Sequence, residues 1–345
     1  MITVHSDDHR QHFGKSELID GVFHPSFECP DRADRILASV RSGKLGQVVA
    51  PGDHGIAPLL HIHDARYIAF LQHAWARWTG EGNSFDLQAQ VSPLGLRCDA
   101  SFKSESIYAQ MGQFSADSLT PVTAGTWQAA YTSAQIALSA KETIMAGARS
   151  AFALCRPPGH HAASAAMGGF CYLNNAAIAA QSFLDSGAAR VSILDVDYHH
   201  GNGTQEIFYT RPDVQVISIH CDPVCEFPFY WGHEEERGAR KGEGYNLNYP
   251  LPAGTEWAAW GATLSKAMTK IVDYAPDFLI VSLGVDTYKN DPISKFRLET
   301  EDFLRMGELI GSLRMPTLFV QEGGYALEGI GANVTNVLSA FLDKN

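Results

Sequence analysis

Short apolar runs rich in β-branched residues recur along the chain, and segments with helical periodicity separate most of them. Strands that are apolar on both faces are typical of a parallel sheet covered by helices on both sides. The pattern therefore predicts an α/β fold with a single open, mostly parallel sheet flanked by helices. The strands are predicted at 151–155, 191–196, 214–220, 278–286 and 316–321.

The intervening periodicity predicts amphipathic or buried helices. Asp64 is expected to begin the first of them, and Thr255 and Thr300 are candidate N-caps because their side-chain oxygens can accept backbone N–H groups. Gly147 is a candidate C-cap. The helices are predicted at 64–78, 126–146, 174–184, 255–274 and 300–313.

We expect residues 1–345 to form a single domain, since no linker-like tract or internal repeat interrupts the alternation. Residues 79–124 differ from the rest, because they are rich in Ser, Gly and Gln and have little periodicity. A loop of that length inside a compact domain is usually functional or an interaction element.

Composition limits the classes of molecule that the protein could bind. The net charge is −12 and no basic stripe is present, which argues against a nucleic-acid binder and favours a cationic small molecule. No apolar run is long enough to span a membrane, and the N-terminus lacks the pattern of a signal peptide. Six dispersed cysteines fit a reducing cytoplasm better than a disulfide framework.

Polar residues gather where the predicted strands end. The sequences are CRPPGHH, DVDYHH, SIHCD, GVDTY and EGGY, one after each strand in turn. In open α/β sheets, ligands bind outside the carboxyl ends of the strands. This edge is therefore the predicted active site.

Three of these residues are candidate metal ligands. Alternation along the strand would place Asp195, Asp197 and His199 on one face, with the last two reaching over the end of the sheet. Asp286 ends another apolar strand, and two Asp with one His leave a fourth position open, as catalytic zinc requires. The alternatives are an Asp–His hydrogen bond that closes the strand and a turn role for Asp286.

Other residues at this edge suggest acid–base chemistry. His160 and His161 follow a rigid PPG segment, and imidazole can take and return a proton near neutral pH. Tyr325 follows two glycines and could donate a hydrogen bond to a developing oxyanion. Gly169 permits close approach and Phe170 offers an aromatic wall, although a structural histidine pair, a buried tyrosine and a helix start are the plain alternatives.

Together the motifs resemble the histone deacetylase superfamily, in its bacterial acetylpolyamine amidohydrolase branch. The matching segments occur in the family's order, and HDARYIAFL and SFECPDRADR extend the resemblance to most of the chain. The resemblance implies an arginase/deacetylase fold with an eight-stranded parallel sheet. The segments that carry it are RPPGHH, GGFCYLNNAA, ILDVDYHHGNGTQEIFY, ISIHCDP, VSLGVDTYKNDP and EGGY.

The resemblance also implies a role for individual residues. It makes His161 the general base and acid, with His160 as a partner held by Asp195, and Tyr325 the donor to the acetyl carbonyl. One zinc ion per chain is implied, although iron(II) or cobalt(II) would suit the same ligands. The implied zinc ligands are Asp197, His199 and Asp286; the acyl tunnel is lined by Gly169, Phe170 and Phe227; potassium is implied at Asp195, Asp197, His199, Ser218 and Ile219, and a second potassium at Phe208, Arg211, Val214 and Tyr245.

One position departs from part of the family. Asn202 stands where some members carry an aspartate beside the second histidine. An amide supplies no charge, so His161 is expected to be a weaker base here than beside a carboxylate.

The implied activity is hydrolysis of an acetyl amide to acetate and a free amine. Three features favour acetylputrescine- or acetylcadaverine-like substrates: the charge of −12, an insertion at 79–124 resembling the one that forms a homodimer in that branch, and acids at Glu17 and Asp117. For both acids a solvated surface position is an equal alternative.

Three other functions are possible. A protein acetyl-lysine deacetylase would use the same catalytic residues. A non-catalytic acyl-ligand binding module would be signalled by loss of a metal ligand, a dyad histidine or the tyrosine, and all are present. A binuclear manganese hydrolase of the arginase type would need further carboxylates where the chain has His200 and Thr287.

Overall fold

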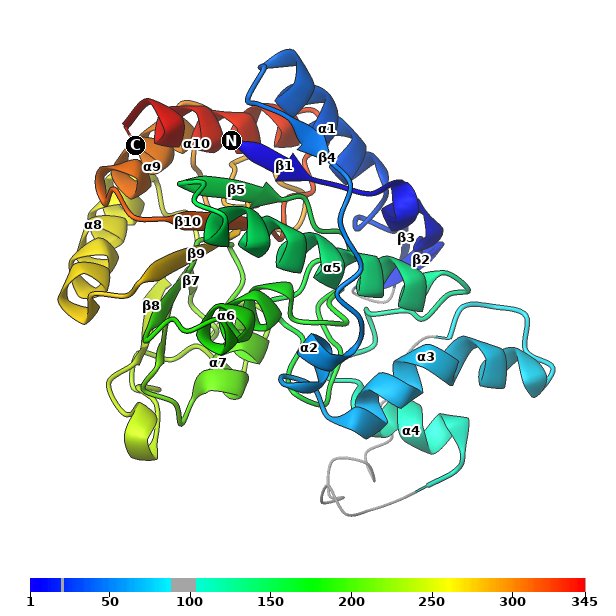
Figure 1. Ribbon diagram of the computed structural model, residues 1–345. Coiled ribbons are helices and arrows are strands. Elements are labelled where there is room, and N and C mark those ends of the chain that lie inside the picture. Colours follow the sequence, from blue (N-terminus) through cyan, green and yellow to red (C-terminus); the bar gives the residue numbers. More distant parts are fainter. Residues whose placement is uncertain (20–21, 88–103, 345) are drawn as a thin grey trace.

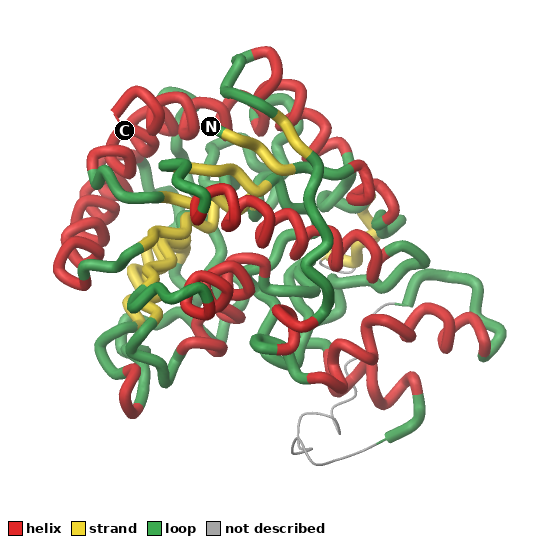
Figure 2. The backbone as a smooth tube through the Cα atoms, in the orientation of Figure 1, coloured by secondary structure: helices red, strands yellow, loops and turns green. Residues whose placement is uncertain are grey.

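One parallel sheet forms the centre of the molecule (Figures 1 and 2). The computed structural model describes residues 1–19, 22–87 and 104–344. Eight of the described strands pair in the order β4-β1-β5-β10-β9-β6-β7-β8, with every neighbour parallel, which confirms the predicted fold class. These strands are β1 (Ile2–Val4), β4 (Val48–Val49), β5 (Ser150–Ala153), β6 (Val191–Asp195), β7 (Val214–Cys221), β8 (Asn246–Leu251), β9 (Phe278–Leu283) and β10 (Thr317–Gln321).

Helices cover both faces of the sheet, and a small antiparallel hairpin of β2 (Ser16–Ile19) and β3 (Val22–Pro25) stands apart (Figure 1). Short 3-10 helices, η1 (Asp7–Gln11) and η3 (Arg240–Gly242), lie in connections. The α-helices are α1 (Asp31–Ser42), α2 (Ala57–Leu60), α3 (Ala65–Gly80), α4 (Ile107–Phe114), α5 (Thr126–Met145), α6 (Asn175–Asp185), α7 (Asn202–Phe208), α8 (Trp257–Tyr274), α9 (Asp302–Ser312) and α10 (Ile330–Lys344).

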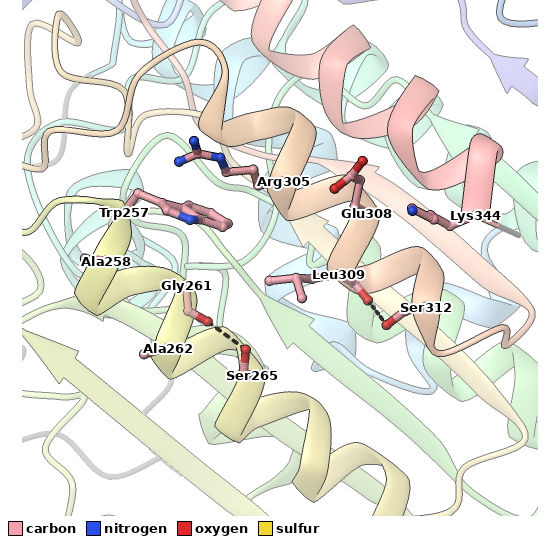
Figure 3. Close-up of a pocket in the computed structure, with 10 residues that line it drawn as sticks. All are labelled: Trp257, Ala258, Gly261, Ala262, Ser265, Arg305, Glu308, Leu309, Ser312 and Lys344. Atoms are coloured by element: carbon pink, nitrogen blue, oxygen red, sulfur yellow. Dashed lines mark hydrogen bonds between the residues drawn. The ribbon is translucent and has the colours of Figure 1, made fainter.

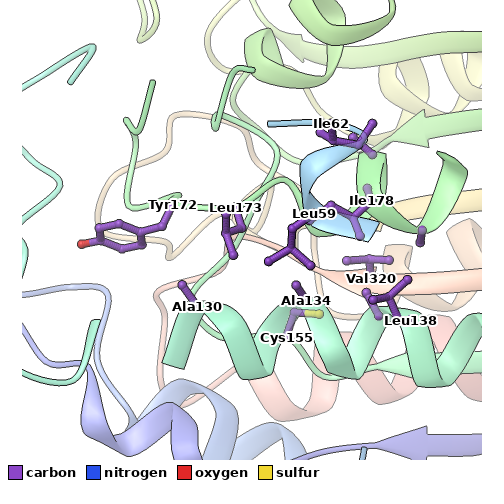
Figure 4. Close-up of a cluster of buried hydrophobic side chains, with 14 of the residues drawn as sticks. Leu59, Ile62, Ala130, Ala134, Leu138, Cys155, Tyr172, Leu173, Ile178 and Val320 are labelled. Atoms are coloured by element: carbon purple, nitrogen blue, oxygen red, sulfur yellow. The ribbon is translucent and has the colours of Figure 1, made fainter. Parts of the chain in front are cut away.

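Strand β5 shows why the apolar runs are continuous rather than alternating. Ala151 and Ala153 pack into one core with residues of α3, α5 and α6. Figure 4 shows another part of this core, where Leu138 of α5, Ile178 of α6 and Val320 of β10 are drawn. Phe152 and Leu154 pack into a second core with α1, α9 and α10. Because successive side chains point to opposite faces, a strand buried on both sides favours apolar residues at successive positions rather than at alternate ones.

Two predicted helix caps are wrong. The N-caps of α8 and α9 are Glu256 and Glu301, neither with a side-chain capping bond, and the Thr255 hydroxyl instead donates to the carbonyl of Pro252. The prediction at Asp64 is confirmed, because its carboxylate accepts the N–H groups of Arg66 and Tyr67.

Several elements escaped sequence prediction because they are short or weakly periodic. They include β1 and β4, of three and two residues, which cannot display a period at all. Within the predicted insertion at 79–124, α4 forms a helix beside α3, while residues 88–103 lie outside the described part of the chain. Among the described residues, no helix combines the length and apolarity needed to cross a membrane.

Candidate active site

The candidate residues follow four strands that are adjacent in the sheet. His160 and His161 come after β5, Tyr325 after β10, Asp286 after β9, and Asp197 with His199 after β6. The order β5-β10-β9-β6 and the parallel direction bring all four carboxyl ends to one edge. The sheet topology therefore assembles residues that lie as much as 165 positions apart, from 160 to 325.

Asp197, His199 and Asp286 form a buried cluster. One ligand atom from each lies within 4.8 Å of the others. Nδ1 of His199 is 3.4 Å from Oδ1 of Asp197 and 3.1 Å from Oδ2 of Asp286. The ladder of β6 ends at Asp195, so the prediction that alternation along the strand aligns these residues is wrong; Asp197 and His199 reach the cluster from the following loop.

Two glycines leave the space that the carboxylates occupy. A Cβ on Gly284 would lie 2.0 Å from Oδ2 of Asp197, and one on Gly323 would lie 2.5 Å from Oδ2 of both Asp197 and Asp286. The N–H of Gly323 also donates to Asp197. The backbone thus closes tightly around the carboxylates and fixes their direction.

The cluster carries an excess of buried negative charge. Burial and the charge of Asp197 raise the pKa of Asp286 to about 7. Burial opposes protonation of His199, but its contacts with Asp197 and Asp286 outweigh this and raise its pKa to about 10. Two carboxylates and one imidazole that favour a shared positive charge are the donor set that a divalent metal ion satisfies.

The histidine pair sits beside this cluster in two different environments. Nδ1 of His160 donates to Asp195 at 2.9 Å, and Nδ1 of His161 donates to the amide oxygen of Asn202 at 2.7 Å. Burial lowers the pKa of His160, but the charges of Asp197 and Asp195 outweigh it and raise that pKa to about 10. Burial and the neighbouring His160 hold the pKa of His161 well below its usual value.

Aromatic side chains pack against two of the candidate catalytic residues. The ring of Phe227 meets His161 edge-on with centroids 4.9 Å apart, and Phe170 meets Tyr325 in the same way at 5.7 Å. Gly169 has a φ of 52°, and a Cβ there would lie 2.2 Å from the His161 ring. Burial raises the pKa of Tyr325 well above its usual value, so its phenol stays a donor.

The two candidate substrate acids are not solvated surface residues. Asp117 accepts the N–H of Gly169 at 2.6 Å and also bonds Leu119 and Thr120, so both of its oxygens are engaged in holding the turn at Gly169. Glu17 is 2% exposed, and its Oε1 accepts from Ser26 and Phe27. Its Oε2 has no hydrogen-bond partner among the described residues.

The residues suggested for potassium lie on and beside strand β7. Asp195 pairs with Ser218 in the register of β6 and β7, and the Ser218 hydroxyl hydrogen-bonds Nδ1 of His220. Phe208 accepts the N–H of Arg211 in the connection before β7. Ile219 and Val214 also lie in β7, and the carbonyl of Tyr245 accepts the N–H of Val216. Asp197 and His199, the other two members, belong to the buried cluster.

Sequence reasoning missed a buried ion network behind the site. Glu28 bridges the guanidinium groups of Arg32, at 2.7 Å, and Arg156, at 2.9 Å. Arg32 also donates to the carbonyls of Glu322 and Gly324 and lies over the Tyr325 ring, 4.6 Å from its centroid. The network ties the RPPGHH and EGGY loops together, and the only sequence signal is charge in the SFECPDRADR segment.

Two further acids hold the catalytic loops and were also missed. Glu322 accepts the N–H groups of Gly159 and His160, and Asp291 accepts those of Tyr325 and Ala326. These contacts are side chain to backbone across loops distant in sequence, so no local motif reveals them. An open surface pocket beside α8 and α9, lined by Trp257, Arg305 and Glu308 among others, includes none of the site residues (Figure 3).

Comparison with known proteins agrees with this geometry. The family model for the histone deacetylase domain matches residues 24–341. The chain is 59% identical to acetylpolyamine amidohydrolase 1 of Pseudomonas aeruginosa, covering 99% of each, and 44% identical to acetylpolyamine amidohydrolase of Mycoplana ramosa, covering 98% of each. A crystal structure of acetylpolyamine aminohydrolase from Burkholderia pseudomallei superposes with a TM-score of 0.94 at 42% identity, covering 99% of this chain and 98% of that one.

The family resemblance inferred from the motifs is therefore confirmed. The match covers nearly the whole of this chain and nearly the whole of each of these relatives. The chain is an enzyme of the histone deacetylase family and groups with the relatives named acetylpolyamine amidohydrolases.

Proposed function

We propose that this enzyme hydrolyses the acetyl amide of N-acetylated diamines or polyamines, such as acetylputrescine or acetylcadaverine, to acetate and the free amine. The observation that carries the proposal is the buried cluster of Asp197, His199 and Asp286, with the ring centroid of His161 6.1 Å from that of His199. Relatives with 59% and 44% identity are named for this class of substrate, which supports the choice of amide.

The cluster is proposed to hold one zinc ion. Two carboxylates and an imidazole are ligands that zinc accepts, with a position left for water or substrate. When bound, the metal polarises the acetyl carbonyl and makes a water molecule easier to deprotonate. Iron(II) and cobalt(II) accept the same donors, so the metal present in cells also depends on availability.

His161 is proposed to be the general base. Because the Asn202 oxygen accepts the proton on Nδ1, the lone pair of neutral His161 is on Nε2. Its depressed pKa keeps it neutral at pH 7, whereas the raised pKa of His160 keeps that ring charged. His161 takes a proton from water and later delivers it to the departing amine nitrogen, so the C–N bond breaks as acetate forms.

Tyr325 is proposed to donate a hydrogen bond from its phenolic O–H to the acetyl oxygen as negative charge develops there. A donor aimed at a developing oxyanion in a water-poor site typically contributes a factor of about 10²–10³ to turnover. Contacts with Phe170 and Arg32 hold the ring in place, and Phe170 and Phe227 are proposed to line the acyl channel with Gly169.

The substrate amine is proposed to be recognised by charge. The chain carries a net charge of −12, and Glu17 has a buried oxygen with no partner among the described residues. That oxygen could accept a hydrogen bond from the free ammonium group of a diamine. Asp117 is proposed to help shape the channel at Gly169.

The proposal is tested by comparing substrates on zinc-reconstituted enzyme. Acetylputrescine, acetylcadaverine and an acetyl-lysine peptide are assayed for acetate release, and kcat/KM is compared. We expect the diamines to exceed the peptide by at least about tenfold, which corresponds to 1.4 kcal/mol. A preference for the peptide would instead identify a protein acetyl-lysine deacetylase.

Two structural features are proposed from the family resemblance. Potassium is proposed near Asp195 and Ser218, which the β6–β7 register places opposite each other, and near Phe208 and Tyr245. The 79–124 insertion is proposed to form a homodimer contact in the cytoplasm. Light scattering gives the oligomeric state, and exchange of potassium for sodium should lower the thermal midpoint if the potassium sites are occupied.

A further inference from the structure

Two histidines near the N-terminus are buried without a hydrogen-bond partner among the described residues, although each lies within ion-pairing distance of a carboxylate. His5 follows β1 and is 7% exposed, and His9 lies in η1 and is 2% exposed. None of their four ring nitrogens has a hydrogen-bond partner in the described part of the chain. Leaving a buried polar group without a hydrogen bond costs about 1–3 kcal/mol of stability. Two such rings side by side therefore indicate a bound ligand that satisfies their nitrogens.

The two rings lie side by side with their planes tilted by 53°, and each is near a carboxylate. Their centroids are 5.2 Å apart. Nε2 of His5 lies 3.5 Å from Oδ1 of Asp7, and Nε2 of His9 lies 3.3 Å from Oδ1 of Asp34. One ligand atom each from His5, Asp7 and His9 lies within 4.8 Å of the others, so a small rotation of the side chains would bring them onto one ion.

Asp7 is the less engaged of the two carboxylates beside the rings. Asp34 accepts a hydrogen bond from Arg10 at 2.8 Å, whereas Asp7 makes only a longer ion pair with Arg10, at 4.0 Å. The side chain of Asp7 is 83% exposed and can turn towards the rings. A proton is a poor partner here, because burial lowers the pKa of both histidines, to about 3 for His9, where the charge of Arg156 adds to the effect. The neutral imidazole that results is the form that binds a metal ion.

We propose that His5, Asp7 and His9 bind a divalent transition-metal ion of the zinc, cobalt(II) or nickel(II) class, at a site separate from Asp197, His199 and Asp286. Two imidazoles and one carboxylate are a donor set of borderline softness, which suits these ions better than calcium or magnesium. The two clusters share no residue.

The position of the site indicates a structural role. Its ligands come from the end of β1 and from η1, and the carbonyls of His9 and His12 accept the guanidinium of Arg156. Arg156 precedes the loop of His160 and His161. An ion bound here would fix the N-terminal segment that supports this arginine, because binding to the folded state alone adds to stability.

The test counts ions on metal-stripped protein titrated with cobalt(II), using d–d absorption and elemental analysis. We expect two equivalents in the wild type, one in His5→Gln/His9→Gln and one in Asp286→Ala. Asp7→Asn, an exposed change that leaves the core intact, should weaken the second equivalent by at least about tenfold, since even loss of an outer-shell partner costs 10–100-fold. The matched control His61→Gln, on a surface histidine paired with Asp185, should keep two.

Three results would overturn the proposal. The first is a single equivalent in the wild type, which would mean that water satisfies the two rings. The second is an unchanged second equivalent in both Asp7→Asn and the double histidine variant. The third is loss of both ions in Asp286→Ala, which would indicate a binuclear catalytic centre. Circular dichroism and thermal midpoints identify any variant that has lost its fold. If the double histidine variant has unfolded, the affinity of Asp7→Asn for the second cobalt(II) ion decides whether the site exists.

Discussion

At the scale of single residues, the proposed mechanism makes the Tyr325 hydroxyl the donor to the acetyl oxygen. Tyr325→Phe removes the donor and keeps the ring that packs against Phe170 and Arg32. We expect kcat to fall by about 10²–10³ with little change in KM, because the bond forms mainly as charge develops. Steady-state assay of acetylputrescine measures this, with Tyr131→Phe, a half-buried tyrosine bonded to Asp53, as the control. Full turnover in Tyr325→Phe would remove the residue from the mechanism.

Asn202 contributes to the pKa of His161, the proposed base. In Asn202→Asp, a carboxylate at 2.7 Å from Nδ1 would favour the protonated ring and raise the pKa of His161. The base must be neutral to act, and a raised pKa means that it is protonated at a higher pH as the solution is acidified. The acid limb of the kcat/KM profile should therefore move to higher pH. An unmoved limb would show that another group controls it.

At the scale of elements, the turn after β10 determines whether the ligands can meet. In Gly323→Ala the added methyl group would lie 2.5 Å from an oxygen of both Asp197 and Asp286. We expect zinc affinity to fall by at least about tenfold although no ligand is changed, because orientation of ligands governs affinity. Gly80→Ala, where nothing lies within 4 Å, is the control. Equal zinc affinity in both variants would contradict the geometry.

The sequence predicted the central strands well because they are buried on both faces and read as uninterrupted apolar runs. It placed the residues of β5, β6, β7, β9 and β10 correctly to within a few positions. The ends were less accurate: the predicted run 278–286 continues past the strand end at Leu283 into the loop that carries Asp286. Short β1 and β4 have no periodicity to detect, and their place in the sheet depends on tertiary pairing.

Some residues of the candidate site could likewise be predicted from the sequence, and others could not. Asp197, His199, Asp286, His160 and Tyr325 stand in recognisable strand-end motifs, so the sequence alone is enough to identify them as candidates. The supports Glu28, Arg32, Glu322 and Asp291 could not be identified in this way, since each acts on a loop more than 30 positions away. Such contacts are set by the fold rather than by local pattern.

At the scale of the whole molecule, the net charge of −12 should guide cationic substrates to the site. The screening length is about 10 Å at 0.1 M salt and about 3 Å at 1 M, so added salt should lower kcat/KM for acetylputrescine. N-butylacetamide, which is neutral and of similar length, should be unaffected. Parallel salt titrations of both substrates measure the effect, and equal slopes would mean that charge plays no part in recognition.

The central claim is that one metal ion held by Asp197, His199 and Asp286 supports deacetylation. The most direct test measures acetate release from acetylputrescine while zinc is added stepwise to metal-stripped protein. Asp286→Ala is assayed in the same way, and circular dichroism checks that both proteins are folded. We predict that turnover returns with zinc in the wild type and stays at background in Asp286→Ala. Undiminished turnover in stripped wild type, or full recovery in Asp286→Ala, would contradict the account.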